Sequence, residues 1–175
     1  ASDGAALQVL REEFPALLFF ELPSYNPIYP EGENMIAKMA SQLFKFTAAI
    51  KLEHKALSKI VSENEIDIVI SDNRYGCYSS AVESILITHQ STILMPKGAS
   101  VLGKIVNYFN FKQIQKFNRL WIPDYSGQRN LTGNLSDGNG RRKKFIGQLS
   151  RFEKIPNSKN KYDLIAVISG PEPQR

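Results

Sequence analysis

The sequence predicts an α/β domain in which helices cover a parallel sheet. Short apolar runs rich in β-branched residues alternate along the chain with segments whose apolar residues recur at helical spacing. Alternation of these two kinds of segment is typical of a parallel sheet with covering helices. At 175 residues, of which 42% are hydrophobic and 22% charged, the chain is long enough to bury one core.

Three elements are expected before residue 65. Apolar residues at helical spacing, preceded by Asp3 at the N-cap position, predict a short helix over 4–14. The apolar run 17–22, which Pro23 closes, predicts a strand. After a proline-rich loop, apolar residues that step by three, four or seven predict a long helix over 33–62.

The remaining elements continue the alternation. Residues 66–71 are nearly continuous β-branched residues and predict a strand buried on both faces, and 84–89 predict a second strand. An amphipathic helix is expected to end near residue 117, followed by strands at 119–123, 144–147 and 162–170. The glycine- and asparagine-rich stretch from Asp124 to Lys144 indicates an exposed loop.

Composition narrows the class of protein. The chain has one cysteine and two histidines, which rules out an internal disulfide and argues against a Cys/His metal site. It has no apolar stretch of membrane-spanning length and no signal-peptide pattern, so a cytoplasmic protein is expected. The net charge of +5 favours an anionic partner.

Polar residues follow the two predicted strands at 66–71 and 84–89. Asp72 and Asn73 follow the first, and His89 and Gln90 close the second. Because ligands bind at the carboxyl ends of parallel strands, these side chains are expected to face one crevice, where they would bind a sugar hydroxyl or a phosphate. The structural alternative is that Asp72 caps a helix beginning near Tyr75 and that His89 only makes hydrogen bonds in a turn.

A family resemblance adds to this interpretation. Residues 67–90, together with the terminal segment 162–175, resemble the N-terminal half of GT-B glycosyltransferases, above all the N-acetylglucosaminyltransferase of peptidoglycan synthesis and related bacterial proteins. His89 and Gln90 resemble the family's His-Glu-Gln turn, with the glutamate missing. Ser169 and Gly170 resemble the loop that faces the donor diphosphate. The resemblance implies a Rossmann-like fold and one half of a two-domain architecture.

The resemblance also implies an organisation. Residues 1–155 would form the acceptor-side domain, and 156–175 the crossover and first strand of the donor-side domain. Nothing in the chain resembles the family's first strand and glycine-rich loop, so an inactive fragment is expected, with the catalytic base in the missing loop. The substrate would be a nucleotide-diphosphate sugar, expected to be UDP-linked, with no cofactor or metal.

The function implied is sugar transfer to an acceptor hydroxyl. Asp72, Asn73, His89 and Gln90 would orient the acceptor or a phosphate. Two alternatives stay open, namely a non-catalytic sugar- or phosphate-binding domain and a nucleotide-sugar epimerase of the same fold. The upstream coding sequence would separate transferase from binding module.

The middle of the chain is locally basic. No acidic residue lies between Glu83 and Asp124, an interval that contains five basic residues: Lys97, Lys104, Lys112, Lys116 and Arg119. The amphipathic segment from Val101 to Phe117 would allow peripheral contact with an anionic membrane, close to a lipid-linked acceptor. The alternative is an ordinary covering helix with solvated lysines. A nucleic-acid partner is not expected, because aromatic residues are not interleaved with the basic ones.

Overall fold

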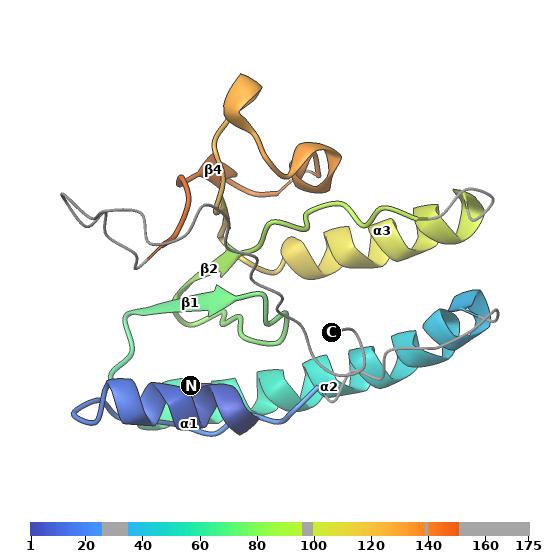
Figure 1. The fold of residues 1–175 in the computed structure, drawn as a ribbon. Coiled ribbons are helices and arrows are strands. Elements are labelled where there is room, and N and C mark those ends of the chain that lie inside the picture. Colours follow the sequence, from blue (N-terminus) through green and yellow to red (C-terminus); the bar gives the residue numbers. More distant parts are fainter. Residues whose placement is uncertain (26–34, 96–99, 139, 151–175) are drawn as a thin grey trace, which may run out of the picture.

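The computed structural model describes residues 1–25, 35–95, 100–138 and 140–150, and it confirms the α/β class with a four-stranded parallel sheet and helices (Figure 1). In chain order the elements are α1 (Gly4–Glu13), α2 (Met35–Glu63), β1 (Ile68–Asp72), β2 (Glu83–Ile87), α3 (Ser100–Ile114), β3 (Arg119–Ile122), the 3₁₀ turns η1 (Gly127–Arg129) and η2 (Gly133–Ser136), and β4 (Lys144–Phe145).

The sheet has the order β1-β2-β3-β4, and each neighbouring pair is parallel. Its register places Asp72 beside Ile87, Ile87 beside Trp121, and Trp121 beside Lys144. The last residues of β1 and β2 therefore lie in one row with Trp121, and β3 and β4 each extend one residue further, to Ile122 and Phe145. Whatever follows them in the chain emerges at a common carboxyl edge.

The main core lies between the sheet and the two longer helices. Leu86 and Leu120, fully buried on neighbouring strands, pack in one cluster with Ile50 of α2, with Ile114 at the end of α3 and with Phe117 shortly after it. Each such apolar side chain contributes roughly 1.5–3 kcal/mol when it is fully buried. Helices α2 and α3 thus cover the same face of the sheet.

The opposite face of β1 corrects one prediction. Ile68 and Ile70 are 50% and 57% exposed, so this strand is not buried on both faces. Neither residue belongs to the packed clusters formed by the described residues. A run of β-branched residues indicates that a strand forms, but it does not indicate which faces of that strand are covered by other parts of the chain.

One further prediction, and the alternative given for Asp72, were wrong. The segment 17–22 forms only an isolated parallel bridge, Ser2 with Glu21, and Leu17 and Leu18 are largely exposed. No helix begins near Tyr75, because residues 73–82 form turns, so Asp72 caps nothing. Segment 17–22 does not become a strand because a strand needs several consecutive residues of a neighbouring segment to pair with, and among the described residues only Ser2 pairs with it. The predicted strand at 162–170 and the domain boundary near 155 lie outside the described residues.

Candidate functional site

The turns after β1 and β2 are joined to each other at the carboxyl edge. Asn73 has φ +54°, in the left-handed region that asparagine tolerates better than most residues. Its N–H donates to the carbonyl of Ile87 at 2.9 Å, and its Oδ1 accepts from the Thr88 hydroxyl at 3.0 Å. Thr88 Oγ1 also accepts from the N–H of Gln90 at 3.1 Å. Thr88, which is 2% exposed, therefore connects the two predicted pairs of site residues.

The structure places all four described site residues at this edge. Asp72, Asn73, His89 and Gln90 are all exposed. No hydrogen bond or ion pair among the described residues joins Asp72 to His89. The two polar pairs are thus neighbours across adjacent strands, with exposed side chains, but they do not form an acid–base dyad. Ser169 and Gly170 lie outside the described part of the chain.

Helix α3 holds the segment that follows His89. The amide nitrogen of Asn110 donates to the carbonyls of Gln90 and Ser91, at 3.3 and 3.1 Å. One turn earlier, Asn107 accepts from the N–H of Ile93 at 2.7 Å and donates to its carbonyl at 2.8 Å. These asparagines replace the sheet contacts that the chain loses where β2 ends, so the exposed turn has a fixed backbone.

A buried carboxylate organises the loop after β3. Asp124 is 1% exposed and accepts hydrogen bonds from the N–H groups of Tyr125, Leu131 and Thr132 and from the Thr132 hydroxyl, at 2.7–3.2 Å. These bonds, that of the hydroxyl first, lower the pKa of Asp124 to about 2. The stretch after Asp124 is therefore anchored at its start, which its glycine-rich composition does not reveal.

This loop packs against the turn after β2. The carbonyl of Leu135 accepts from the N–H of Thr92 at 2.8 Å and from the hydroxyl of Ser91 at 3.2 Å. Gly138 fits closely there, since a Cβ on it would lie 2.2 Å from the carbonyl oxygen of Ser91. The loop and the predicted site residues consequently form one connected edge.

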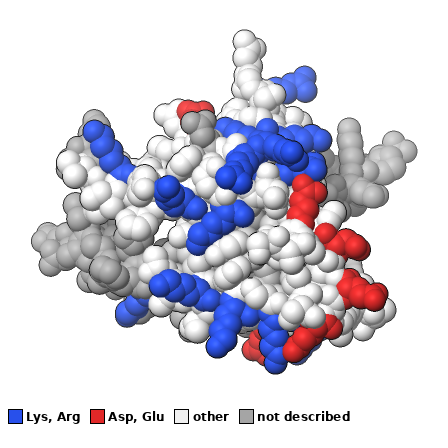
Figure 2. Space-filling model, turned by 180° about the vertical axis from the view of Figure 1, so that it is seen from behind, with Lys and Arg blue, Asp and Glu red and all other residues white. Residues whose placement is uncertain are grey.

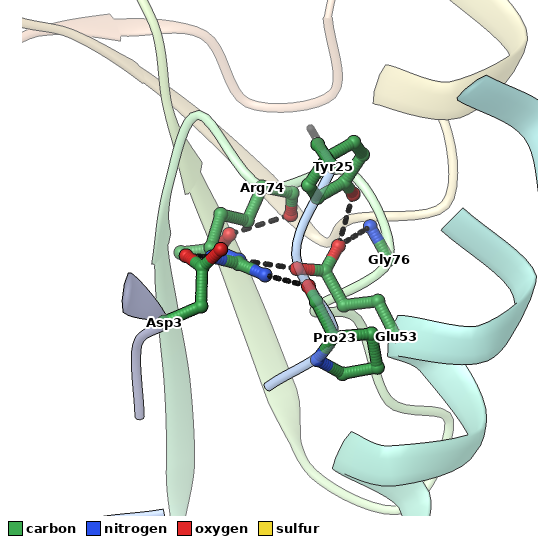
Figure 3. Close-up of polar contacts among 7 residues, drawn as sticks. Asp3, Pro23, Tyr25, Glu53, Arg74 and Gly76 are labelled. Carbon is green, nitrogen blue, oxygen red and sulfur yellow. Dashed lines mark hydrogen bonds and ion pairs between the residues drawn. The ribbon is translucent and has the colours of Figure 1, made fainter. Parts of the chain in front are cut away.

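A network of charged side chains lies behind the turn after β1 (Figure 3). The guanidinium of Arg74 pairs with Glu53 of α2 and with Asp3, and it donates to the carbonyl of Pro23 at 2.7 Å. Glu53, which is fully buried, also accepts from the hydroxyl of Tyr25 and from the N–H of Gly76 at 2.7 Å.

The electrostatics of this network follow from its pairing. Burial alone would lower the pKa of Arg74, but the hydrogen bonds and charges of Glu53 and Asp3 raise it. Burial, followed by the hydrogen bond to Glu53, raises the pKa of Tyr25. The sequence patterns do not single out Arg74 or Glu53. The two residues are 21 positions apart, and nothing in the sequence around either one indicates that they pair.

Helix α3 presents apolar and basic side chains together on its surface. Val101 and Tyr108 are 71% and 58% exposed, Ile105 and Phe109 are exposed as well, and Lys112 lies 5.4 Å from the centre of the Tyr108 ring. The helix therefore covers the core and also exposes aromatic and aliphatic groups to solvent. Among the described residues, no helix combines the length and the apolar character needed to cross a bilayer.

The edge offers hydrogen-bonding groups and no built-in metal site. Within the described part of the chain, no three histidine, cysteine or acidic residues gather as metal ligands would. The one cysteine, Cys77, is buried, which together with the nearby charge of Glu53 raises its pKa to about 12, so its thiol is a poor nucleophile. What remains is a set of exposed amide, carboxylate and imidazole groups on a fixed backbone, which suits the binding of hydroxyls or phosphates.

Comparisons with protein-family models, with curated proteins and with solved structures found no match for this chain.

Proposed function

We propose that this chain is the acceptor-side half of a GT-B glycosyltransferase, which moves a sugar from a nucleotide-diphosphate donor, expected to be UDP-linked, to an acceptor hydroxyl in the cytoplasm. The observation that supports it best is the pair of turns joined through Thr88, which sets Asp72, Asn73, His89 and Gln90 together at the carboxyl edge of a parallel sheet. That edge is where α/β proteins bind ligands.

The proposed chemistry is a displacement at the anomeric carbon. The acceptor oxygen forms a bond to that carbon, the bond to the nucleotide diphosphate breaks, and the acceptor proton passes to a base. Because Asp72 and His89 share no hydrogen bond, and neither is paired with another described residue as an activated base would be, both are assigned to orienting the acceptor or a phosphate. Ser169 and Gly170 are assigned to the donor side, and the base to a segment outside this chain.

The orientation role depends on a rigid backbone. Asn73 and Thr88 fix each other, while Asn110 holds the carbonyls of Gln90 and Ser91. Holding a reactant in place contributes to rate only if the groups that hold it do not move. The buried Thr88 is accordingly a positioning residue, and His89 touches the ligand.

The test uses the full-length product of the gene that encodes this chain. Release of nucleotide diphosphate is measured over a panel of sugar donors with lipid and carbohydrate acceptors. We expect His89→Ala to lose most of the activity, and Thr88→Val to raise KM for the acceptor more than it lowers kcat. The isolated 175-residue chain is expected to be inactive. Unchanged activity of His89→Ala, or turnover by the isolated chain, would contradict the assignment.

A binding domain without catalysis is the second candidate, and the missing contact between Asp72 and His89 is what favours it. In that case the full-length protein binds a sugar phosphate in calorimetry, with loss of binding in His89→Ala, and releases no diphosphate with any donor. Calorimetry and the release assay together separate the two functions.

Contact with an anionic membrane is part of the first proposal, since a lipid-linked acceptor, one of the two kinds expected, would lie there. The exposed Val101 and Tyr108, with Lys104 and Lys112 beside them on α3, support it. We expect a Val101→Asp, Tyr108→Asp double variant to lose most of its co-sedimentation with phosphatidylglycerol vesicles. Leu131→Asp, which alters a 73% exposed leucine in the loop after β3, is the matched control and should bind as before. If both variants lose vesicle co-sedimentation equally, α3 is not the part of the chain that contacts the membrane.

A further inference from the structure

The hydrogen bonds between strands continue past the carboxyl end of β3 on both of its sides. On the side of β2, the N–H of Thr88 donates to the carbonyl of Trp121 at 3.1 Å. On the side of β4, the N–H of Gly147 donates to the carbonyl of Asp124 at 3.0 Å. The segments that follow β2, β3 and β4 are therefore held side by side. Tyr125, the residue after Asp124, emerges from the same edge of the sheet as the predicted site residues.

Tyr125 is exposed on a fixed backbone. Its N–H donates at 2.7 Å to the carboxylate of Asp124, which also accepts from the N–H groups of Leu131 and Thr132. The residue itself is 42% exposed. Gly147 lies beside its ring, since a Cβ built on that glycine would be 3.6 Å from Cε1 and 4.0 Å from the hydroxyl oxygen. The backbone that carries the ring is therefore fixed, while much of the residue is open to a ligand.

The residues around Tyr125 favour hydroxyl groups over a phosphate as the ligand. The three residues that follow each of β2, β3 and β4 include no lysine or arginine. After β1, the guanidinium of Arg74 is paired with Asp3 and with the buried Glu53. Figure 2 shows where lysine and arginine side chains do gather, across one face of the molecule with acidic ones along its border. Amides, a carboxylate and an imidazole beside the strand ends suit hydroxyl groups, whereas a phosphate is bound best by cations.

We propose that the carboxyl edge binds a disaccharide unit, with one of its sugar rings stacked on Tyr125. A sugar ring has a face of C–H groups and a rim of hydroxyls, so an aromatic ring binds its face and polar groups bind its rim. Neighbouring strands are about 4.8 Å apart, which places the ends of β1 and β3 roughly 10 Å from each other. Two linked rings cover that distance, so the second ring reaches Asp72 and His89.

This assignment rests on the proposed function, because it names the chemical class of the acceptor, which is a carbohydrate chain. Tyr125 binds that chain and takes no part in the displacement at the anomeric carbon. Binding of a free disaccharide and release of nucleotide diphosphate are measured separately. Failure of the one is therefore distinguishable from failure of the other.

The first experiment measures the binding of cellobiose, maltose and di-N-acetylchitobiose to the full-length product of the gene that encodes this chain. Saturation-transfer NMR detects weak binding and identifies the sugar protons that contact the protein. We expect at least one disaccharide to bind, with the C–H protons on one face of one ring saturated most strongly. Tyr125→Ala should weaken this binding about tenfold, as expected for the loss of one aromatic contact.

Further variants separate stacking from other roles of the side chain. Tyr125→Phe keeps the flat ring and should bind the disaccharide nearly as well as the wild type. Tyr125→Leu keeps an apolar side chain without a flat face, and it should weaken binding as much as Tyr125→Ala does. Phe14→Ala is the matched control, because it removes an aromatic side chain that is 48% exposed directly after α1. It should leave the affinity for the disaccharide unchanged.

Three results would overturn the proposal: no binding of any of the three disaccharides to the wild type, full binding by Tyr125→Leu, or an equal loss in Phe14→Ala. The release assay then separates binding from transfer. If a disaccharide binds through Tyr125 and no donor yields nucleotide diphosphate, the binding assignment stands and the transfer function fails. If diphosphate is released and Tyr125→Ala leaves KM for the carbohydrate acceptor unchanged, the transfer function stands and the binding assignment fails.

Discussion

Two groups of charged and polar residues, each including a residue of the segment 72–74, surround the turn after β1, and they differ in burial. Arg74 and Glu53 are withdrawn from solvent, and each is bound by several partners. Asp72 and His89 are exposed, with no ion pair among the described residues. A buried charge needs its partners for the fold to be stable, whereas an exposed one leaves its hydrogen-bonding capacity for a ligand. The first group therefore belongs to stability, and the second is the group that we propose binds a ligand.

Removing a buried partner should have the largest effect. Glu53→Ala leaves Arg74 without its main counter-charge and the hydroxyl of Tyr25 without an acceptor. Loss of one partner of a buried pair is expected to lower the free energy of unfolding by about 3–5 kcal/mol, measured by urea denaturation. Glu63→Ala, which breaks the exposed i,i+4 pair with Lys59, is the control and should change it by less than about 1 kcal/mol. Similar losses in both variants would show that burial is not what separates the two pairs.

Asp124 should give a smaller loss that depends on pH. Its pKa is about 2 in the folded protein against 3.8 ordinarily, so its charged form stabilises the fold above about pH 4, and this stabilisation disappears as pH falls towards 2. Asp124→Asn should therefore be less stable than the wild type at pH 6, and the difference should shrink between pH 4 and pH 2. Thermal unfolding at a series of pH values checks this. If the difference in stability between Asp124→Asn and the wild type stays constant over this pH range, the charge of Asp124 does not contribute to the stability of the fold.

The exposed site residues should have the smallest effect on stability. Asp72→Ala and His89→Ala remove side chains that make no hydrogen bond or ion pair to the described residues, so each should change the free energy of unfolding by no more than about 0.5 kcal/mol. Urea denaturation of both variants measures this. A loss above about 2 kcal/mol in either one would place that residue with Arg74 and Glu53, as a structural group.

Local sequence was a good guide to where the four polar residues lie and a poor guide to the contacts that hold the turns around them. Asp72 and His89 were predicted to lie together because they follow two strands, and the register confirms that those strands are neighbours. Thr88 sits between the second strand and His89, so its position was visible in the sequence. Its bond to Asn73 was not, because that bond depends on the left-handed conformation of Asn73.

The sequence by itself determined the α/β class, the long helix α2 and the four parallel strands, because side-chain periodicity and β-branched runs act over a few neighbouring residues. Only the tertiary structure decided that β1 exposes Ile68 and Ile70, that segment 17–22 forms no strand, and that Glu53 meets Arg74. Those outcomes depend on which distant segments pack together. Such contacts are set by the free energy of the whole packed domain, and the local pattern at either end does not contain them.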